Sequence, residues 1–187
     1  AVWRNVIHLH QQLPSDCYEL FLKKRYEVNA DDELMMSIAE NIKQIELDVP
    51  RTIGVSPSSL YNILYACVMC YPDVGYCQGM SYLAAMLLTV YDNEEDAFYT
   101  LVTMMNKYEC RQLFKNTFPK LKQFTFVHEQ LMRKRFAKLQ KHLAKLSVNS
   151  NMYLPNWILS MFCHSFSSDF ATDVFEGFLL HGWIAFH

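Results

Sequence analysis

Two short runs decide how this sequence folds: Ile45-Glu46-Leu47-Asp48-Val49-Pro50-Arg51-Thr52 and Pro72-Asp73-Val74-Gly75-Tyr76-Cys77-Gln78-Gly79-Met80. The first run places Arg51 just beyond a strongly periodic helix, three residues after Asp48. The second run places Gln78 after a turn, where another helix begins. Arginine can neutralise charge on a transferring phosphoryl group, and glutamine can orient an attacking water. An arginine and a glutamine held at the ends of separate helices therefore suit phosphoryl-transfer chemistry.

The segment before the first run has the period of an amphipathic helix. Its apolar residues recur at steps of four, four and three, at Leu34, Ile38, Ile42 and Ile45. Asp31 or Asp32 can cap the start of this helix. Pro50 ends it and stiffens the approach to Arg51. The next helix is expected to start at Ser56-Pro57, because serine followed by proline is a recognised start signal.

The same period continues through the rest of the sequence. We expect helices after Gln78 and after Asp92 or Asn93, a long helix or helix pair from Pro119 to Leu146, a helix holding Trp157, Ile158, Met161 and Phe162, and a last one from about Asp169. No segment alternates with period two, and no internal repeat is found. The sequence therefore predicts an all-α fold, a compact array of packed helices without a sheet.

Composition narrows the class of protein. The chain has 187 residues, 51% of them hydrophobic, and a net charge of −2. This size allows one domain with a sizeable core, and the charge argues against a nucleic-acid partner. The sequence contains no transmembrane-length apolar run and does not open on a signal-peptide pattern. We therefore expect a cytoplasmic protein with free thiols.

No metal site is expected. Cys67 and Cys70 have C-x-x-C spacing, but they fall inside a helix and have no second pair at zinc spacing. His8 and His10 form an H-x-H pair without a carboxylate or cysteine cluster nearby. These residues are interpreted as core thiols and as surface or hydrogen-bonded histidines.

The two opening runs resemble the motifs I-x-x-D-x-x-R and Y-x-Q of the TBC domain of Rab GTPase-activating proteins. Tyr76 follows Arg51 by 25 residues, in the family's order. The likeness extends over Asn62 to Met105, His142-Leu143 and the run from Tyr153 to Phe162. It covers nearly the whole chain. Both ends break off close to an apolar pattern, so residues 1–187 are expected to form a single TBC domain truncated at both ends.

The resemblance implies a function and a site. The partner would be a small GTPase of the Rab class in its GTP-bound form, and the chain would accelerate its GTP hydrolysis. Arg51 would stabilise charge on the γ-phosphoryl group, and Gln78 would position the attacking water. The chain needs no cofactor of its own, because GTP and Mg²⁺ belong to the partner. Asp48, Thr52, Tyr76 and Gly79 are the expected supporting residues.

Those supporting residues have more specific expected roles. A carboxylate at Asp48 can hold the guanidinium of Arg51 by charge-assisted hydrogen bonds. Tyr76 is expected to buttress the site, and Gly79 to let a partner's backbone approach closely. The sequence departs from the family pattern at Ile53-Gly54, where phenylalanine and proline are usual, and at Ser81, where asparagine is common. Neither departure removes a chemical group of the site.

A different class of function stays open. The stretch from Glu129 to Lys145 carries six basic residues and one acidic residue, together with an apolar stripe. Such a basic amphipathic helix can lie on an anionic membrane or bind calmodulin, although a solvated face over a core stripe is the commoner case. The alternative to a GTPase activator is therefore a non-catalytic helical module that binds a GTPase or, peripherally, an anionic membrane surface.

Overall fold

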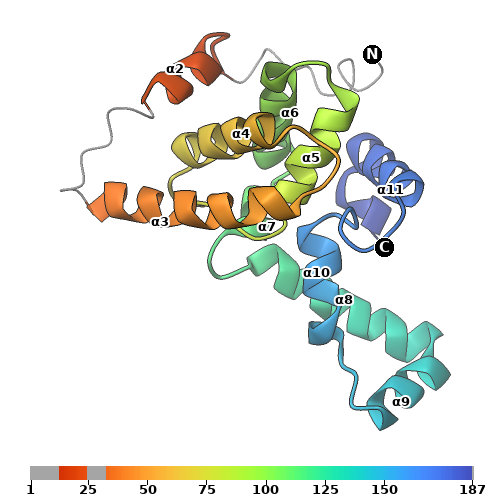
Figure 1. The fold of residues 1–187 in the computed structure, drawn as a ribbon. Coiled ribbons are helices and arrows are strands. Elements are labelled where there is room, and N and C mark those ends of the chain that lie inside the picture. The colour runs from red at the N-terminus through yellow and green to blue at the C-terminus, as the bar shows by residue number, and fades with distance from the viewer. Residues whose placement is uncertain (1–12, 25–32, 187) are drawn as a thin grey trace.

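The computed structural model describes residues 13–24 and 33–186, and every regular element in these two ranges is a helix. Figure 1 shows their arrangement. In chain order they are α2 (Cys17–Lys23), α3 (Glu33–Asp48), η3 (Val49–Arg51), α4 (Pro57–Cys70), α5 (Met80–Val90), α6 (Glu94–Lys107), α7 (Arg111–Phe114), α8 (Pro119–Arg135), α9 (Ala137–Lys145), η4 (Ser150–Met152), α10 (Leu154–Leu159), α11 (Ser168–His181) and η5 (Gly182–Phe186). The predicted all-α fold is confirmed for the described residues.

Helix α4 is the centre of the core. It packs against α2, α3, α5 and α6, and Figure 1 shows it running beside α3. Residues 63–68 are buried without interruption, so this helix is enclosed on nearly all sides. Its start is as predicted: Pro57 occupies the first turn, and Ser56 Oγ accepts a hydrogen bond from the backbone N–H of Ser59. These contacts fix α4, which follows the loop that carries Arg51.

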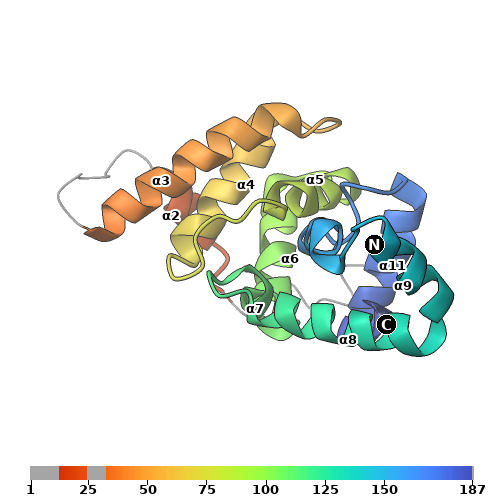
Figure 2. The same cartoon turned by 90° about the horizontal axis from the view of Figure 1, so that it is seen from below.

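Two other predicted starts and one predicted break are also observed. Asn93 caps α6, because its Oδ1 accepts from the Asp96 N–H at 2.7 Å. The last long helix begins one residue before Asp169, with Ser167 as its cap. The stretch from Pro119 forms a helix pair, which Figure 2 shows as α8 turning into α9. The turn lies at Phe136, whose φ of −127° and ψ of 38° are not helical.

Two details of the sequence reading were wrong. Leu34 is 46% exposed, although it continues the stripe of Ile38 and Ile45, which are buried. The helix predicted to hold Met161 and Phe162 ends at Leu159, because those two residues have positive φ angles of 46° and 66°. His8, His10, Asp31 and Asp32, on which other predictions were made, lie outside the described residues.

Candidate functional site

Arg51 ends the short helix η3, which continues α3 by one further turn. Pro50 lies inside that turn. Thr52 closes it: its N–H donates to the Val49 carbonyl at 3.2 Å, and its hydroxyl donates to the Asp48 carbonyl at 3.0 Å. Thr52 is buried, whereas the Arg51 side chain is 72% exposed. The backbone under Arg51 is thus held firmly while its guanidinium remains free to meet a partner.

Asp48 binds Tyr76 more closely than it binds Arg51. The Tyr76 hydroxyl donates to Asp48 Oδ2 at 2.7 Å, whereas Arg51 Nη1 lies 4.0 Å from Asp48 Oδ1. A separation of 4.0 Å is an ion pair but not a hydrogen bond. The expectation that Asp48 grips the guanidinium by hydrogen bonds was therefore wrong. Its carboxylate instead joins the two sequence motifs, which are 28 residues apart at this contact.

The hydroxyl of Tyr76 is well placed to keep its proton. Burial raises the pKa of Tyr76 well above the ordinary value, and the negative charge of Asp48 raises it further. A hydroxyl that stays protonated always has a donor to offer the carboxylate. At neutral pH the Tyr76 hydroxyl therefore remains a donor to Asp48.

Sequence reasoning missed Asn41, which holds the turn before Gln78. Asn41 Oδ1 accepts a hydrogen bond from the Tyr76 N–H at 2.5 Å, and its amide nitrogen donates to the Ser37 carbonyl at 2.7 Å. Gly75 makes room for it, because a Cβ at Gly75 would lie 2.6 Å from Asn41 Oδ1. The one available signal was spacing: Asn41 precedes Asp48 by seven residues, which is two helical turns. Both side chains of α3 face the 72–78 segment.

Gly79 lies against the end of α10. Its φ is +111°, and a Cβ there would lie 2.7 Å from the carbonyl oxygen of Leu159. Gly79 is also buried. The backbone that comes close to it in the structure is this chain's own, at the end of α10. The approach of a partner's backbone stays a prediction. The contact brings α10 against the start of α5, beside Gln78.

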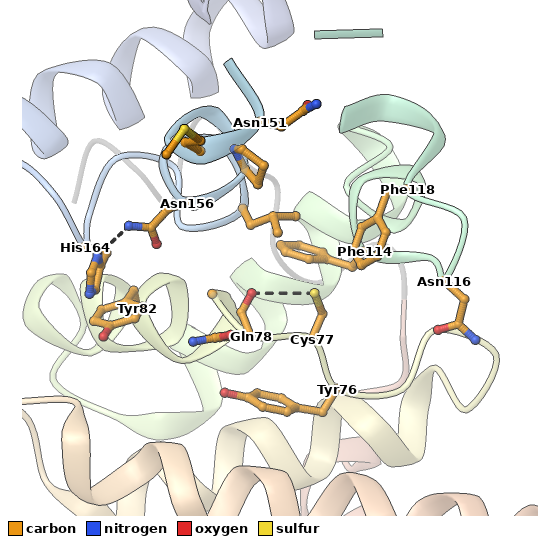
Figure 3. Close-up of a pocket in the computed structure, with 14 residues that line it drawn as sticks. Tyr76, Cys77, Gln78, Tyr82, Phe114, Asn116, Phe118, Asn151, Asn156 and His164 are labelled. Carbon is orange, nitrogen blue, oxygen red and sulfur yellow. Dashed lines mark hydrogen bonds between the residues drawn. The ribbon is translucent and has the colours of Figure 1, made fainter. Parts of the chain in front are cut away.

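The close approach forms one wall of a cleft of about 690 Å³. Figure 3 shows the cleft, with Tyr76, Cys77 and Gln78 on one side and residues of η4 and α10 on the other. Gln78 is exposed at its edge. Of the predicted site residues, Tyr76, Gln78 and Gly79 line the cleft. Arg51, Asp48 and Thr52 do not, and the Asp48–Tyr76 hydrogen bond connects the two groups.

The far wall holds a cluster that the sequence did not indicate. Asn156 donates through Nδ2 to His164 Nδ1 at 3.0 Å and to Ser165 Oγ at 3.2 Å. The His164 ring also meets the Tyr82 ring edge-on, with centroids 4.6 Å apart. Asn156 comes from α10, Tyr82 from α5 and His164 from the turn after α10. No motif marks them because the contacts depend on how these segments pack.

The C-x-x-C pair lies inside helix α4. Cys67 is buried and Cys70 half-buried, and both are free thiols. Burial raises the pKa of Cys70 to about 11, which keeps it protonated at neutral pH. Within residues 13–24 and 33–186, no three histidine, cysteine or acidic side chains gather closely enough to hold a metal ion. None of the helices in those ranges combines the length and the apolar character needed to cross a membrane.

An all-helical fold with an exposed arginine, an exposed glutamine and a hydrogen bond between their motifs defines a class, and comparison with known proteins identifies it. Residues 1–187 match the Rab-GTPase-TBC domain. The chain therefore belongs to the TBC domain family of Rab GTPase-activating proteins.

Individual relatives agree with this assignment. The chain is 31% identical over 153 residues to the GTPase-activating protein GYP5 of Eremothecium gossypii, a match that covers 80% of the chain and 18% of that protein. It is 31% identical over 149 residues to the Rab GTPase-activating protein eat-17 of Caenorhabditis elegans, which covers 75% of the chain and 17% of that protein. The chain thus spans less than a fifth of the length of these relatives.

A solved structure has the same fold. The crystal structure of the Chlamydomonas flagellar RabGAP TBC domain matches with a TM-score of 0.76 at 19% identity. The match covers 98% of this chain and 61% of that one. At this identity the likeness concerns the arrangement of the helices, which is the arrangement seen in Figure 1.

Proposed function

We propose that this chain accelerates GTP hydrolysis by a small GTPase of the Rab class, bound in its GTP form, by supplying Arg51 and Gln78 in trans. The observation that carries the proposal is the hydrogen bond between Tyr76 and Asp48. It fixes the segment that bears Gln78 to the end of α3, directly before the turn that bears Arg51. Both functional side chains are exposed, as residues that act on a partner's nucleotide must be.

The two groups would divide the chemistry. Arg51 stabilises negative charge that develops on the γ-phosphoryl group, and Gln78 orients the attacking water. An arginine supplied to a GTPase in this way contributes roughly 10³–10⁵ in rate, or about 4–7 kcal/mol of the barrier. The names of the relatives support the choice of a Rab-class partner, since one is called a Rab GTPase-activating protein.

A single-turnover assay of GTP hydrolysis across a panel of Rab-class GTPases tests the proposal. Arg51→Ala is expected to lower stimulated hydrolysis by roughly 10³-fold or more. Arg51→Lys should also be poor, because the planar fork that spans phosphate oxygens is lost. Arg135→Ala is the matched control, since Arg135 is an exposed arginine at the end of α8. Near-normal turnover by Arg51→Lys would refute the assignment of Arg51.

The role of Gln78 needs a two-by-two comparison. Gln78→Ala and alanine at the partner's own catalytic glutamine are measured singly and together. If Gln78 orients the water, its loss cripples hydrolysis while the loss of the partner's glutamine is tolerated comparatively well. Gln130→Ala controls for removing an exposed glutamine elsewhere on the surface. The reverse pattern would make Gln78 a binding residue and leave Arg51 to act alone.

One observation favours a second, peripheral contact with an anionic membrane. Helix α9 has no buried residue, and Figures 1 and 2 show the α8–α9 pair extending away from α4 and α5. The helix carries exposed lysines and exposed Leu139, and exposed Phe136 and Leu146 flank its two ends. Basic and apolar side chains on one exposed helix suit the interface of anionic lipids.

Vesicle binding separates this contact from catalysis. Neutralising Lys134, Lys138 and Lys141 together should reduce binding to phosphatidylserine vesicles and leave GTP hydrolysis in solution nearly unchanged. Equal vesicle binding by the variant and the unaltered chain would show that the lysines are only a solvated face.

A further inference from the structure

The cleft beside Gln78 has no charged lining among the residues that the structure describes. Four amides, Gln78, Asn116, Asn151 and Asn156, line it, together with Tyr76, Tyr82 and the imidazole of His164. Figure 3 shows these amides spread over both sides of the cleft. A carboxylate or phosphate that entered would find no cation there, so burying it would cost free energy. Amide side chains both donate and accept hydrogen bonds, as peptide groups do.

The remaining lining is apolar and aromatic. Phe114 is buried at the floor, and Leu159 and Pro155 of α10 form part of a wall. Met152 is 66% exposed at the rim, and methionine adapts readily to the shape of a partner. An apolar floor with surrounding amides suits an extended segment of polypeptide that has uncharged side chains.

His164 lines this cleft and is held there by two neighbouring side chains. Asn156 Nδ2 lies 3.0 Å from His164 Nδ1, and the Tyr82 ring packs against the imidazole from the side. With the amide nitrogen of Asn156 facing the ring, Nδ1 must accept, because an amide nitrogen has only protons to give. In the neutral imidazole the proton then lies on Nε2. Within the described residues Nε2 makes no hydrogen bond of its own.

Arg51, by contrast, does not line the cleft. The charged group of the site and the uncharged cleft therefore face different parts of a bound partner. Figure 3 shows the Gln78 side chain and His164 at the same end of the cleft, on opposite sides of it. A segment that binds His164 would consequently lie next to the group proposed to orient water.

We propose that the cleft binds an uncharged main-chain segment of the partner GTPase, and that His164 donates from Nε2 to a peptide carbonyl of that segment. This inference rests on the proposed function, because it takes the partner to be a GTPase of the Rab class. His164 is thus a binding residue that sets the position of the partner's segment relative to Gln78. Asn156 is a positioning residue, since it acts by fixing the tautomer and the orientation of the ring.

Binding tests the inference separately from turnover. Each Rab-class GTPase of the panel is loaded with a non-hydrolysable GTP analogue, and its Kd for the chain is measured by calorimetry. His164→Ala is expected to weaken binding about 3–10-fold, the effect of one neutral hydrogen bond. His164→Gln should stay within about twofold, because the Gln amide nitrogen reaches the position of Nε2. His164→Asn should be as weak as His164→Ala, because its shorter amide reaches only the position of Nδ1.

Two controls sharpen the experiment. His142→Ala removes an exposed histidine of α9 that does not line the cleft and should leave Kd unchanged. The factor lost in His164→Ala should be the same at low and high salt, because a neutral hydrogen bond is not screened as exposed charges are. Asn156→Ala should weaken binding by a similar factor, and Asn156→Ala combined with His164→Ala by hardly more.

The outcomes separate the two proposals. An unchanged Kd in His164→Ala, or equal Kd values for the Gln and Asn variants, would overturn the assignment of His164 while turnover by the unaltered chain still supports the proposed function. Binding that depends on His164 without any stimulated hydrolysis would overturn the catalytic proposal and leave the cleft assignment standing. Failure to bind any GTPase of the panel would overturn both.

Discussion

Replacing Tyr76 by phenylalanine removes one oxygen atom and with it the hydrogen bond that joins the two motifs. The bond is short, at 2.7 Å, and its acceptor is the Asp48 carboxylate, whose side chain is only 17% exposed. A hydrogen bond to a charged group contributes about 1.5–3 kcal/mol. We expect Tyr76→Phe to lower the free energy of unfolding by that amount, and Tm by about 3–12 °C.

The same bond is expected to matter for the partner's reaction as well as for stability. Without the bond, the segment bearing Gln78 is no longer tied to the helix bearing Arg51. A displacement of about 1 Å at a reacting centre can cost on the order of 10²-fold in rate, so stimulated hydrolysis should fall about 10–100-fold. Single-turnover hydrolysis with the best GTPase of the panel measures this, and thermal unfolding measures the stability.

Tyr108→Phe is the matched control. The Tyr108 hydroxyl donates at the same 2.7 Å to the Leu179 carbonyl of α11, and neither residue belongs to the two motifs. This variant also loses a hydrogen bond and some stability, but stimulated hydrolysis should be unaffected. The reasoning fails if Tyr76→Phe is destabilised as expected and yet stimulates hydrolysis as well as Tyr108→Phe does. The Asp48–Tyr76 contact would then support the fold alone.

Two further predictions concern the segment around Gln78. Gly79→Ala should destabilise the fold by more than the roughly 1–3 kcal/mol of backbone strain, because its Cβ would also meet the Leu159 carbonyl at 2.7 Å. Gly54→Ala is the control, because Gly54 has a φ of +97° and no atom within 4 Å of the added Cβ, so that only backbone strain destabilises it. Equal urea midpoints for the two variants would show that the Leu159 contact adds nothing. Burial raises the pKa of Asp73, but the hydrogen bonds and charge of Arg111 lower it more, to a net value below 3.8. Because the folded-state pKa of Asp73 is depressed, its stabilisation is present above pH 3.8 and is lost as pH falls through the folded-state value. Asp73→Asn should therefore be less stable than the unaltered chain at pH 7 and equally stable in acid. A difference in the free energy of unfolding that stays the same at both pH values would contradict this.

The elements of the fold could be predicted from sequence wherever local signals agree. Ser56 followed by Pro57 marks a helix start by chemistry that acts within one turn, and the structure confirms it. Asn93 acts in the same way at the start of α6. The end of α10 could not be predicted, because Met161 and Phe162 adopt positive φ without a glycine to announce it. Apolar periodicity indicates a helix there, and the packing of the chain overrides it.

The site was predicted unevenly for a related reason. Arg51 and Gln78 are marked by motifs, so they can be named without a structure, although their catalytic roles stay predictions. The supporting contacts cannot be named in this way, since each joins segments far apart in the chain. Tyr76 contacts Asp48 although the two residues are 28 positions apart. The sequence predicts neither this contact nor that Tyr76 lies closer to Asp48 than Arg51 does.

The turn after α10 explains how the late part of the chain serves the early motif. The Phe162 N–H donates back to the Trp157 carbonyl at 2.7 Å, and the His164 N–H donates to Ser160 Oγ at 3.4 Å. These bonds reverse the direction of the chain directly after Leu159, the residue whose carbonyl lies against Gly79. The reversal brings His164 against Tyr82, which lies about one helical turn after Gln78 in the sequence. Gly79 therefore shapes both walls of the cleft. Its backbone conformation lets α5 start directly after Gln78, and its missing side chain lets α10 come close enough to place His164 on the wall opposite Gln78.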